Sequence, residues 1–256
     1  MTDVAAPLAG RAVVVTGGSS GIGRAIALAA ARAGADVALT YRANETGARD
    51  VEREVVALGR RALVVRLDLA DVHSIRATAR SARETLGRID AWINNAGADI
   101  LTGPADALST LDKLDLLMRV DLRGTMVASW EAAELLGAQD EGGVIVNMSW
   151  DHVITGMAGT NPQLFAAVKG GVLAFSKALA RTVAPRVRVN IIAPGWIETS
   201  FGAGVDERVY RSVAESTPLK RWGTPEDVAG AAVFLASPAA SFLTGETIHV
   251  GGGIVM

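Results

Sequence analysis

The segment AVVVTGGSSGIGRAIALAAARAG, residues 12–34, decides the fold. It begins with the short β-branched run Ala12–Thr16, passes through a glycine-rich turn, and continues with apolar residues at helical spacing up to Gly34. A strand, a glycine turn and a helix in direct succession are what a phosphate-binding loop requires. Glycines let the backbone approach the phosphates, and the N-terminus of the helix offers free N–H groups. The segment therefore predicts a nucleotide-binding α/β protein.

Outward from this segment, runs suited to strands alternate with helical segments joined by short connections. Further strands are predicted at Asp36–Tyr41, Ala62–Leu67, Ile89–Ile93, Val144–Asn147, Val187–Ile192 and Thr247–Val250. Further helices are predicted at Thr46–Leu58, Asp71–Leu86, Leu108–Leu136, Pro162–Ala184 and Pro225–Ala236. This alternation indicates one α/β Rossmann domain over residues 1–256, with a doubly wound parallel sheet flanked by helices. Residues 200–218 interrupt the pattern and are expected to form a substrate lid.

Composition excludes several classes of function. The chain has 256 residues, a net charge of −2 and no cysteine, so it offers neither a basic footprint for nucleic acid nor a thiolate nucleophile. No apolar run reaches the length of a membrane span, and the N-terminus lacks the pattern of a signal peptide. No cluster of His, Asp and Glu has spacing suited to a metal. We therefore expect a cytoplasmic protein that binds no metal, membrane or nucleic acid.

The end of the second predicted strand bears on the choice of cofactor. Sites for NAD often place an acidic residue here to hold the ribose hydroxyls, but this strand ends in Tyr41-Arg42. An arginine pairs well with a 2′-phosphate, so the sequence favours NADP(H) over NAD(H). The alternative is that Arg42 is a solvated surface charge.

Polar residues of unusual identity gather in the stretch Val144–Gly171. After the strand, a loop carries Asp151 and His152, and the next helix presents Phe165 and Lys169, four residues apart and therefore on one helical face. These side chains are expected to line the reaction site, where a small-molecule substrate would meet the cofactor.

Four motifs, in order, resemble the short-chain dehydrogenase/reductase family along nearly the whole chain. They are Thr16-Gly17-x-x-x-Gly21-x-Gly23, Asn94-Asn95-Ala96-Gly97, Asn190-x-x-Ala193-Pro194-Gly195 with Thr199, and Thr244-Gly245-Glu246. The resemblance implies a seven-stranded Rossmann sheet, an NAD(P)(H) cofactor and a homo-oligomer, either tetramer or dimer. It also implies a set of cofactor-binding residues: Gly17, Ser19, Ser20, Gly21, Ile22, Gly23, Tyr41, Arg42, Asp68, Leu69, Asn95, Ala96, Gly97, Lys169, Pro194, Gly195, Ile197 and Thr199.

The catalytic residues depart from the family pattern of Asn, Ser, Tyr and Lys. Lys169 is retained, but the Tyr position is Phe165 and the Asn position is Asp121. Alignment on the end of the strand puts Trp150 at the Ser position, whereas counting back about thirteen residues from Phe165 gives His152. Ser149 is adjacent, but strand alternation is expected to turn it to the other face.

Three interpretations follow, all involving the candidate catalytic set Lys169, His152, Asp121, Ser149, Phe165 and Trp150. In the first, the chain reduces a carbonyl or oxidises an alcohol, and His152 replaces the Tyr as proton donor, since imidazole titrates near neutrality. Buried Asp151 or Asp121, or Tyr210 reaching in from the lid, are other candidate donors. His152 as an ordinary loop residue is the alternative.

In the second interpretation the substrate is an iminium ion that needs no proton, and the aromatic pair Trp150 and Phe165 stabilises its charge. Packing of these rings as core is the alternative. In the third, hydride transfer is lost, and the fold serves as a cofactor-holding scaffold, a partner subunit or a non-redox catalyst. A hydrolase triad of Ser149, His152 and Asp151 is disfavoured because near neighbours in one loop rarely converge correctly. The sequence favours an atypical NADP(H)-dependent oxidoreductase acting on a small carbonyl, alcohol or imine.

Overall fold

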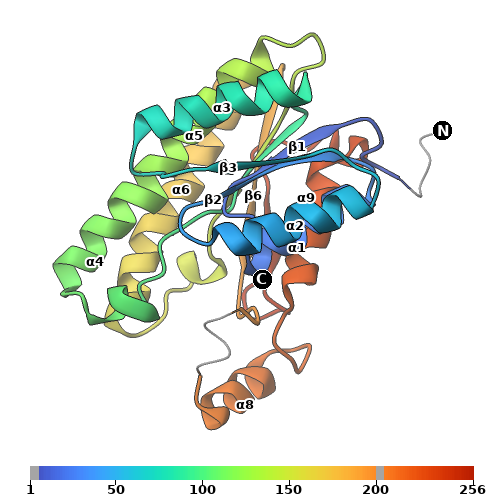
Figure 1. The fold of residues 1–256 in the computed structure, drawn as a ribbon. Helices are drawn as coiled ribbons and strands as arrows, with labels where there is room; N and C mark the ends of the chain where they lie inside the picture. The colour runs from blue at the N-terminus through green and yellow to red at the C-terminus, as the bar shows by residue number, and fades with distance from the viewer. Residues whose placement is uncertain (1–5, 200–204) are drawn as a thin grey trace.

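A parallel sheet of seven strands forms the centre of the computed structural model, which describes residues 6–199 and 205–256 (Figure 1). The strands are β1 (Ala12–Val15), β2 (Asp36–Tyr41), β3 (Ala62–Arg66), β4 (Ala91–Asn94), β5 (Gly143–Met148), β6 (Val187–Pro194) and β7 (Thr247–Val250). Their spatial order is β3-β2-β1-β4-β5-β6-β7. The predicted doubly wound fold is confirmed.

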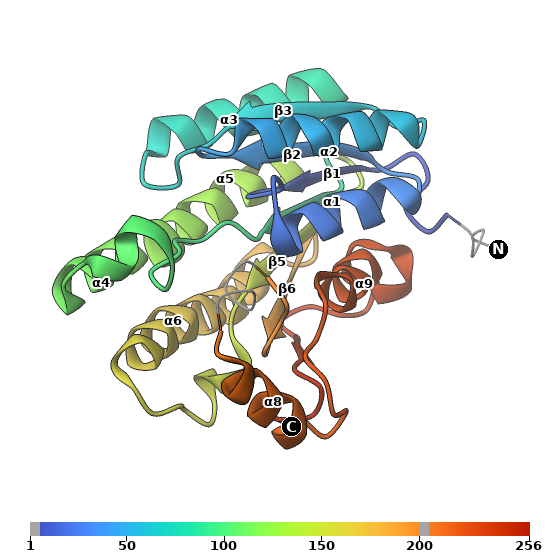
Figure 2. The same ribbon diagram turned by 60° about the horizontal axis from the view of Figure 1, so that its bottom comes forward.

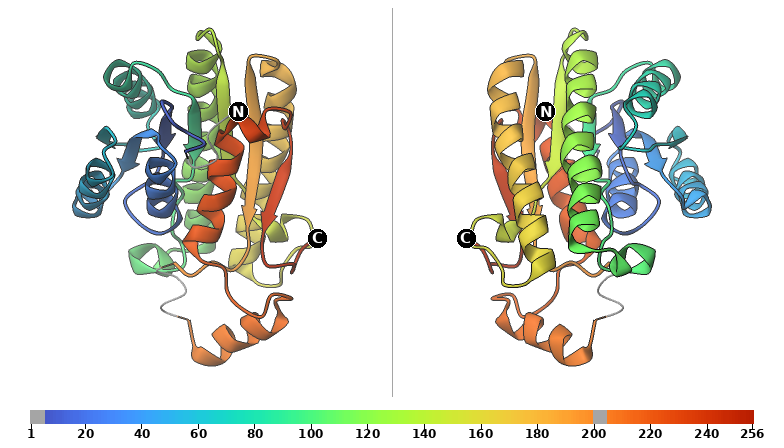
Figure 3. Two further views of the ribbon diagram at one scale, coloured as in Figure 1. Left: turned by 90° about the vertical axis from the view of Figure 1, so that its right-hand side faces the viewer. Right: turned by 90° about the vertical axis from the view of Figure 1, so that its left-hand side faces the viewer.

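Helices cover both faces of the sheet (Figure 3). One face carries α1 (Gly21–Arg32), α2 (Glu45–Ala57) and α9 (Pro225–Ala236). The other carries α3 (Val72–Leu86), α5 (Thr125–Gly137) and α6 (Thr160–Val183), with α4 (Thr110–Leu117) against α6. Because the central strands are covered on both sides, they are apolar runs without alternation, as β1, Ala12–Val15, illustrates.

The long helix predicted at Leu108–Leu136 is divided, which corrects the prediction. Leu108 ends the short 3-10 helix η1 (Gly103–Ala107), and a π-helical segment, η2 (Met118–Gly124), joins α4 to α5. Residue Asp121 lies in this π segment, and its carboxylate accepts the backbone N–H of Ala98 at 2.7 Å. Such interruptions are common at functional sites, and hydrophobic spacing does not reveal them.

Several strand boundaries also differ from those predicted, two of them by two residues. The strand predicted at Ile89–Ile93 begins later, because the N–H of Ile89 donates to the side chain of Gln139 outside the sheet. Strand β6 extends beyond Ile192 to Pro194, because its last residues pair with β7 up to Val250. Gly195 and Trp196, which follow β6 directly, therefore lie at the carboxyl edge of the sheet.

Helix α8 (Glu207–Ser216) lies apart from both helix layers, beyond the carboxyl ends of β5 and β6 (Figure 2, Figure 3). It belongs to the segment expected to be a lid, of which residues 200–204 lie outside the described part. Among the residues that the structure describes, no helix is long and apolar enough to span a membrane.

The N-terminus of α9 supplies a pH-dependent contribution to stability. Asp227 completes a capping box with Thr224, and Arg221 contacts both of its carboxylate oxygens, at 2.6 and 3.0 Å. These bonds, chiefly that from Arg221, lower the pKa of Asp227 to about 2. Because the folded-state pKa lies below the ordinary value, the stabilisation is complete above about pH 4 and is lost as pH falls towards 2.

The substitution Asp227→Asn keeps a capping group but removes the ion pair. We expect it to lower the free energy of unfolding by about 1 kcal/mol at pH 7, a small value because the pair is partly exposed. Urea unfolding at pH 7 and pH 3 tests this, since the difference from the unmodified protein should shrink at the lower pH. An equal difference at both pH values would contradict the assignment.

Candidate active site

A groove of about 890 Å³ opens at the carboxyl edge of the sheet, where the strand order reverses between β1 and β4. This reversal is the place at which open α/β sheets bind ligands. Fourteen of the predicted cofactor-binding residues line it: Gly17, Ser19, Ser20, Gly21, Ile22, Gly23, Tyr41, Arg42, Asp68, Leu69, Asn95, Ala96, Gly97 and Thr199. Its wall also includes Asn44, Thr102, Leu116 and Val120, which sequence reasoning missed because no motif marks them.

The glycine loop is too tight for side chains at its key positions. A Cβ atom on Gly23 would lie 2.1 Å from the carbonyl oxygen of Gly17, and Gly17 itself has a φ of 67°. The side chain of Asn95 braces the loop by donating to the carbonyls of Thr16 and Gly17, at 3.0 and 3.2 Å. A loop held in this shape at the start of α1 fits a dinucleotide pyrophosphate.

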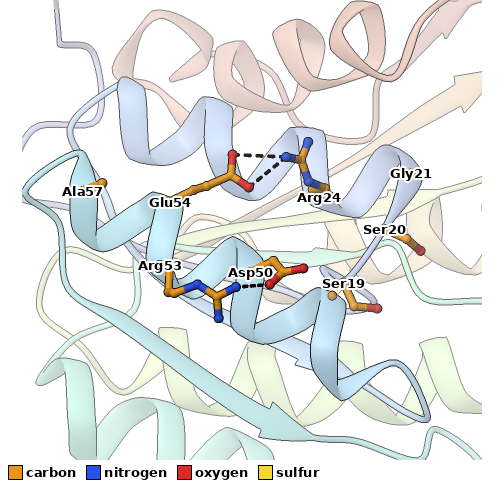
Figure 4. A pocket seen from close by; sticks show the side chains of 9 residues that line it. Ser19, Ser20, Gly21, Arg24, Asp50, Arg53, Glu54 and Ala57 are labelled. Carbon is orange, nitrogen blue, oxygen red and sulfur yellow. Dashed lines mark hydrogen bonds and ion pairs between the residues drawn. The ribbon is translucent and has the colours of Figure 1, made fainter.

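Three arginines lie at or beside the rim of the groove, and two of them form ion pairs. Beside the loop, Arg24 contacts both carboxylate oxygens of Glu54, at 2.8 and 3.1 Å, and Arg53 pairs with Asp50 (Figure 4). Arg42 lines the groove, is exposed, and has no ion-pair partner within residues 6–199 and 205–256. It is therefore the arginine on this rim that is placed to meet a phosphate.

Four predicted cofactor-binding residues lie outside the groove wall. Ile197 is buried and bridges to Gly223, Pro194 ends β6, and Gly195 borders Asp151. Lys169 is the fourth, and it connects to the groove through Asp121.

The buried carboxylate of Asp121 forms an ion pair with Lys169. The Lys169 Nζ atom lies 3.0 Å from Asp121 Oδ2 and 3.4 Å from the carbonyl oxygen of Met148. Asp121 also touches the groove wall from behind, because its Oδ1 accepts the N–H of Ala98, and a Cβ on Gly97 would lie 2.7 Å from its Oδ2. The π segment thus places one carboxylate between the groove floor and the lysine of α6.

The side chain of Ser149 is hydrogen-bonded to the backbone of α6. Its hydroxyl donates to the carbonyl oxygen of Lys169 at 3.0 Å, and its backbone N–H continues the ladder to Ile192. With its hydroxyl directed to α6, Ser149 forms no contact with His152 that would build a hydrolase triad.

A buried aspartate contacts the ring of His152. The carboxylate of Asp151 is completely buried, and its Oδ1 lies 2.5 Å from His152 Nδ1. Burial raises the pKa of Asp151, and the neighbouring His152 opposes that rise. Two glycines make space for the Asp151 carboxylate, since a Cβ on Gly195 or on Gly251 would lie 2.5 Å from its Oδ2. An imidazole held at Nδ1 keeps Nε2 for another partner.

The rings of Trp150 and His152 are neighbours, so the two alignments of the sequence lead to the same place. They stack at 5.0 Å with an interplanar angle of 25°, and Phe165 lies edge-on to Trp150 at 6.4 Å. His152 lies edge-on to Trp196 at 6.5 Å. Trp196 in turn contacts Trp222, and Trp222 contacts Tyr210 of α8. Trp196 follows a recognised motif and was open to prediction, whereas nothing in the sequence points to Trp222.

Tyr210 is engaged within this group of rings. It stacks on Trp222 at 4.9 Å. Its hydroxyl donates to Glu198, and this bond raises the pKa of Tyr210.

Within the described ranges, no group of three or more His, Asp and Glu residues could hold a metal ion.

Comparison with known proteins places this geometry in a family. Residues 17–255 match the family described as enoyl-(acyl carrier protein) reductase. The chain is 36% identical over 258 residues to the 3-oxoacyl-(acyl-carrier-protein) reductase of Vibrio harveyi, covering 97% of this chain and 99% of that one.

Solved structures agree. A short-chain dehydrogenase from Burkholderia cenocepacia in complex with NADP has a TM-score of 0.86 and 35% identity, covering 97% of this chain and 99% of that one. A 7α-hydroxysteroid dehydrogenase complexed with NADH and 7-oxo glycochenodeoxycholic acid has a TM-score of 0.89 and 29% identity, covering 100% and 98%. The chain belongs to the short-chain dehydrogenase/reductase family and is a short-chain oxidoreductase.

Proposed function

We propose that this protein is an NADP(H)-dependent oxidoreductase that reduces a small carbonyl compound, or oxidises the alcohol, with His152 as the proton-transferring residue. The observation that carries the proposal is the 2.5 Å approach of His152 Nδ1 to the buried carboxylate of Asp151. A histidine whose one nitrogen is held by a buried acid has a fixed tautomer and orientation, as general acid–base catalysis requires. Phe165, at the usual tyrosine position, has no proton to give.

The roles of the other residues follow from their contacts. NADP(H), when bound in the groove, supplies or accepts the hydride. His152 gives its Nε2 proton to the developing alkoxide oxygen during reduction and takes it back during oxidation. Lys169, paired with Asp121, would hold the cofactor ribose, and Asn95 keeps the loop in shape. These assignments define an active site that lacks the family's catalytic Tyr, Ser and Asn.

The Asp121–Lys169 pair supports this non-standard arrangement. In the family pattern the lysine charge lowers the pKa of the tyrosine, but here no phenol is present. The adjacent carboxylate of Asp121, 3.0 Å away, balances the charge instead. An iminium substrate is a second candidate, favoured by the aromatic pair Trp150 and Phe165, because an iminium carbon accepts hydride without needing a proton.

Preference for NADP(H) rests on Arg42, which lies on the groove rim and has no ion-pair partner in the described part of the chain. The nearby Arg66 donates through Nε to the carbonyl oxygen of Arg42 at 3.4 Å and adds positive charge at the same place. Relatives do not decide the matter, since one structure holds NADP and another NADH.

The substitution Arg42→Ala is expected to weaken NADPH binding by tenfold or more and to leave NADH binding within about twofold, because only NADPH carries the 2′-phosphate. Calorimetric titration with both nucleotides measures this. Arg53→Ala is the matched control, because Arg53 is already paired with Asp50. Equal loss of affinity for both nucleotides would show that Arg42 does not read the phosphate.

Three further predictions remain proposals. Residues 200–218, including α8, act as a substrate lid, which faster proteolysis of this segment in the nucleotide-free protein would support. The protein assembles as a dimer or tetramer, which sedimentation velocity would test. It resides in the cytoplasm, which fractionation would test.

A further inference from the structure

The largest cluster of aromatic rings in the described site region runs along the proposed reaction centre. Six residues form it: Phe165, Trp150, His152, Trp196, Trp222 and Tyr210, joined by five ring contacts of 4.9 to 6.5 Å. We call it the aromatic row. The chain has only five tryptophans and two tyrosines, yet three tryptophans and one tyrosine are here. They come from four separate segments, so helical or strand periodicity does not account for the gathering.

The two ends of the row differ in what they do. At the α8 end, Trp222 is 2% exposed, stacks on Tyr210 at an angle of 4°, and donates its indole N–H to the carbonyl oxygen of Tyr210 at 2.9 Å. This end anchors α8. At the other end Trp150, His152 and Phe165 are each partly exposed, and Phe165 is one helical turn from Lys169. That end faces the reaction.

We propose that the substrate carries its carbonyl group directly on an aromatic ring, as an aryl aldehyde or aryl ketone; this inference rests on the proposed function. Trp150 and Phe165 meet at an interplanar angle of 61° and form a corner against which a flat ring packs, stacked on one and edge-on to the other. His152 stacks on Trp150 with the ring centroids 5.0 Å apart, so the proposed proton donor adjoins this corner. The carbonyl oxygen can reach His152 while the aromatic ring of the substrate occupies the corner only if the carbonyl group is attached directly to that ring.

The charges at the site favour a neutral ring over a cationic one. The carboxylates near the row are engaged: Asp151 with His152, Asp121 with Lys169, and Glu198 with Tyr210. When His152 carries the proton that it donates, it is a cation within the row and repels a second cation. The aromatic row therefore serves a neutral conjugated carbonyl compound better than an iminium ion.

In the reaction considered, NADPH transfers hydride to the carbonyl carbon, the C=O π electrons move to oxygen, and His152 adds the proton there. The products are an aryl carbinol and NADP⁺. Benzaldehyde and cyclohexanecarbaldehyde form a matched pair of substrates, because both have seven carbons and only one is aromatic.

The test compares the ratio of kcat/KM for these two aldehydes in Trp150→Leu, in Trp150→Phe and in the unmodified protein, which cancels their different intrinsic reactivities. We expect the ratio of aromatic to saturated to fall about tenfold in the leucine variant, or about 1.4 kcal/mol. It should stay within threefold in the phenylalanine variant. Trp130→Leu on α5 is the control, because Trp130 contacts Phe175 outside the row. An unchanged ratio in Trp150→Leu would overturn the inference.

Binding of unreactive analogues separates this inference from the proposed function. Calorimetry with the NADP⁺-loaded protein should show benzamide binding about tenfold more tightly than cyclohexanecarboxamide, and Trp150→Leu should abolish the difference. If neither aldehyde is reduced but the amides still differ, the proposed reduction fails while the aromatic site stands. Equal binding of the two amides overturns the inference whatever the activity. Tighter binding of benzylamine, which is cationic at pH 7, than of benzamide overturns the preference for a neutral ring.

Discussion

Replacing His152 with alanine is expected to lower kcat/KM for carbonyl reduction by about 10²- to 10⁴-fold at pH 7, the range typical for loss of a general acid. NADPH affinity should remain within about twofold, because His152 does not line the nucleotide groove. Steady-state kinetics and calorimetry on the same protein samples measure the two quantities. His73→Ala serves as the control, since His73 is exposed at the start of α3 and does not line the groove.

The pH profile distinguishes a proton donor from a merely structural histidine. Reduction consumes a proton that His152 donates, so kcat/KM in the unmodified protein should fall at alkaline pH. In His152→Ala this limb should be missing, while its midpoint of thermal unfolding stays close to that of the unmodified protein. Undiminished turnover in the variant would remove His152 from the mechanism.

Substituting Lys169 with methionine is expected to lower the free energy of unfolding by about 3 kcal/mol at pH 7. Methionine fills most of the volume but leaves the Asp121 carboxylate, which is 1% exposed, without its partner. An uncompensated buried charge costs far more than the loss of a surface ion pair. Urea unfolding of the nucleotide-free protein measures the effect, and Lys177→Met, in the same helix, gives the control.

A double-mutant cycle identifies the origin of this loss. In Asp121→Asn with Lys169→Met both charges are absent, and about two-thirds of the lost stability should return, because no charge is left buried alone. If the double variant is as unstable as Lys169→Met, or less stable, the cost arises from packing and not from the unpaired carboxylate. NADPH affinity should not recover in the double variant, since the proposed ribose contact needs the lysine.

The fold was predictable because each layer of it leaves a local pattern. The glycine loop, the apolar strands and the alternation with helices fix the seven-stranded sheet, and 14 of the predicted cofactor-binding residues line one groove. The interruption around Asp121 was not predictable, because the π segment keeps the same hydrophobic spacing as its neighbouring helices.

The members of the candidate reaction site could be proposed from the sequence, but the contacts between them could not. His152, Lys169, Asp121 and Phe165 stand at motif positions, so they were recognisable from the chain. The residues that they contact are brought to them by tertiary packing. The depth of burial of Asp151, the rings of Trp196 and Trp222, and the pairing of Asp121 with Lys169 depend on how separate segments pack.

The bracing of the glycine loop bears on the order in which the protein acquires its site during folding. The hydroxyl oxygen of Thr16 accepts the N–H groups of Asn95 and Ala96, which lie 79 and 80 residues further along the chain. Contacts of such separation require closure of a long loop and belong to the slow part of folding. The phosphate-binding loop is therefore encoded near the start of the chain but acquires its floor only after β4 has joined β1. A nucleotide that binds only the completed groove stabilises the folded chain and withdraws it from partly paired intermediates.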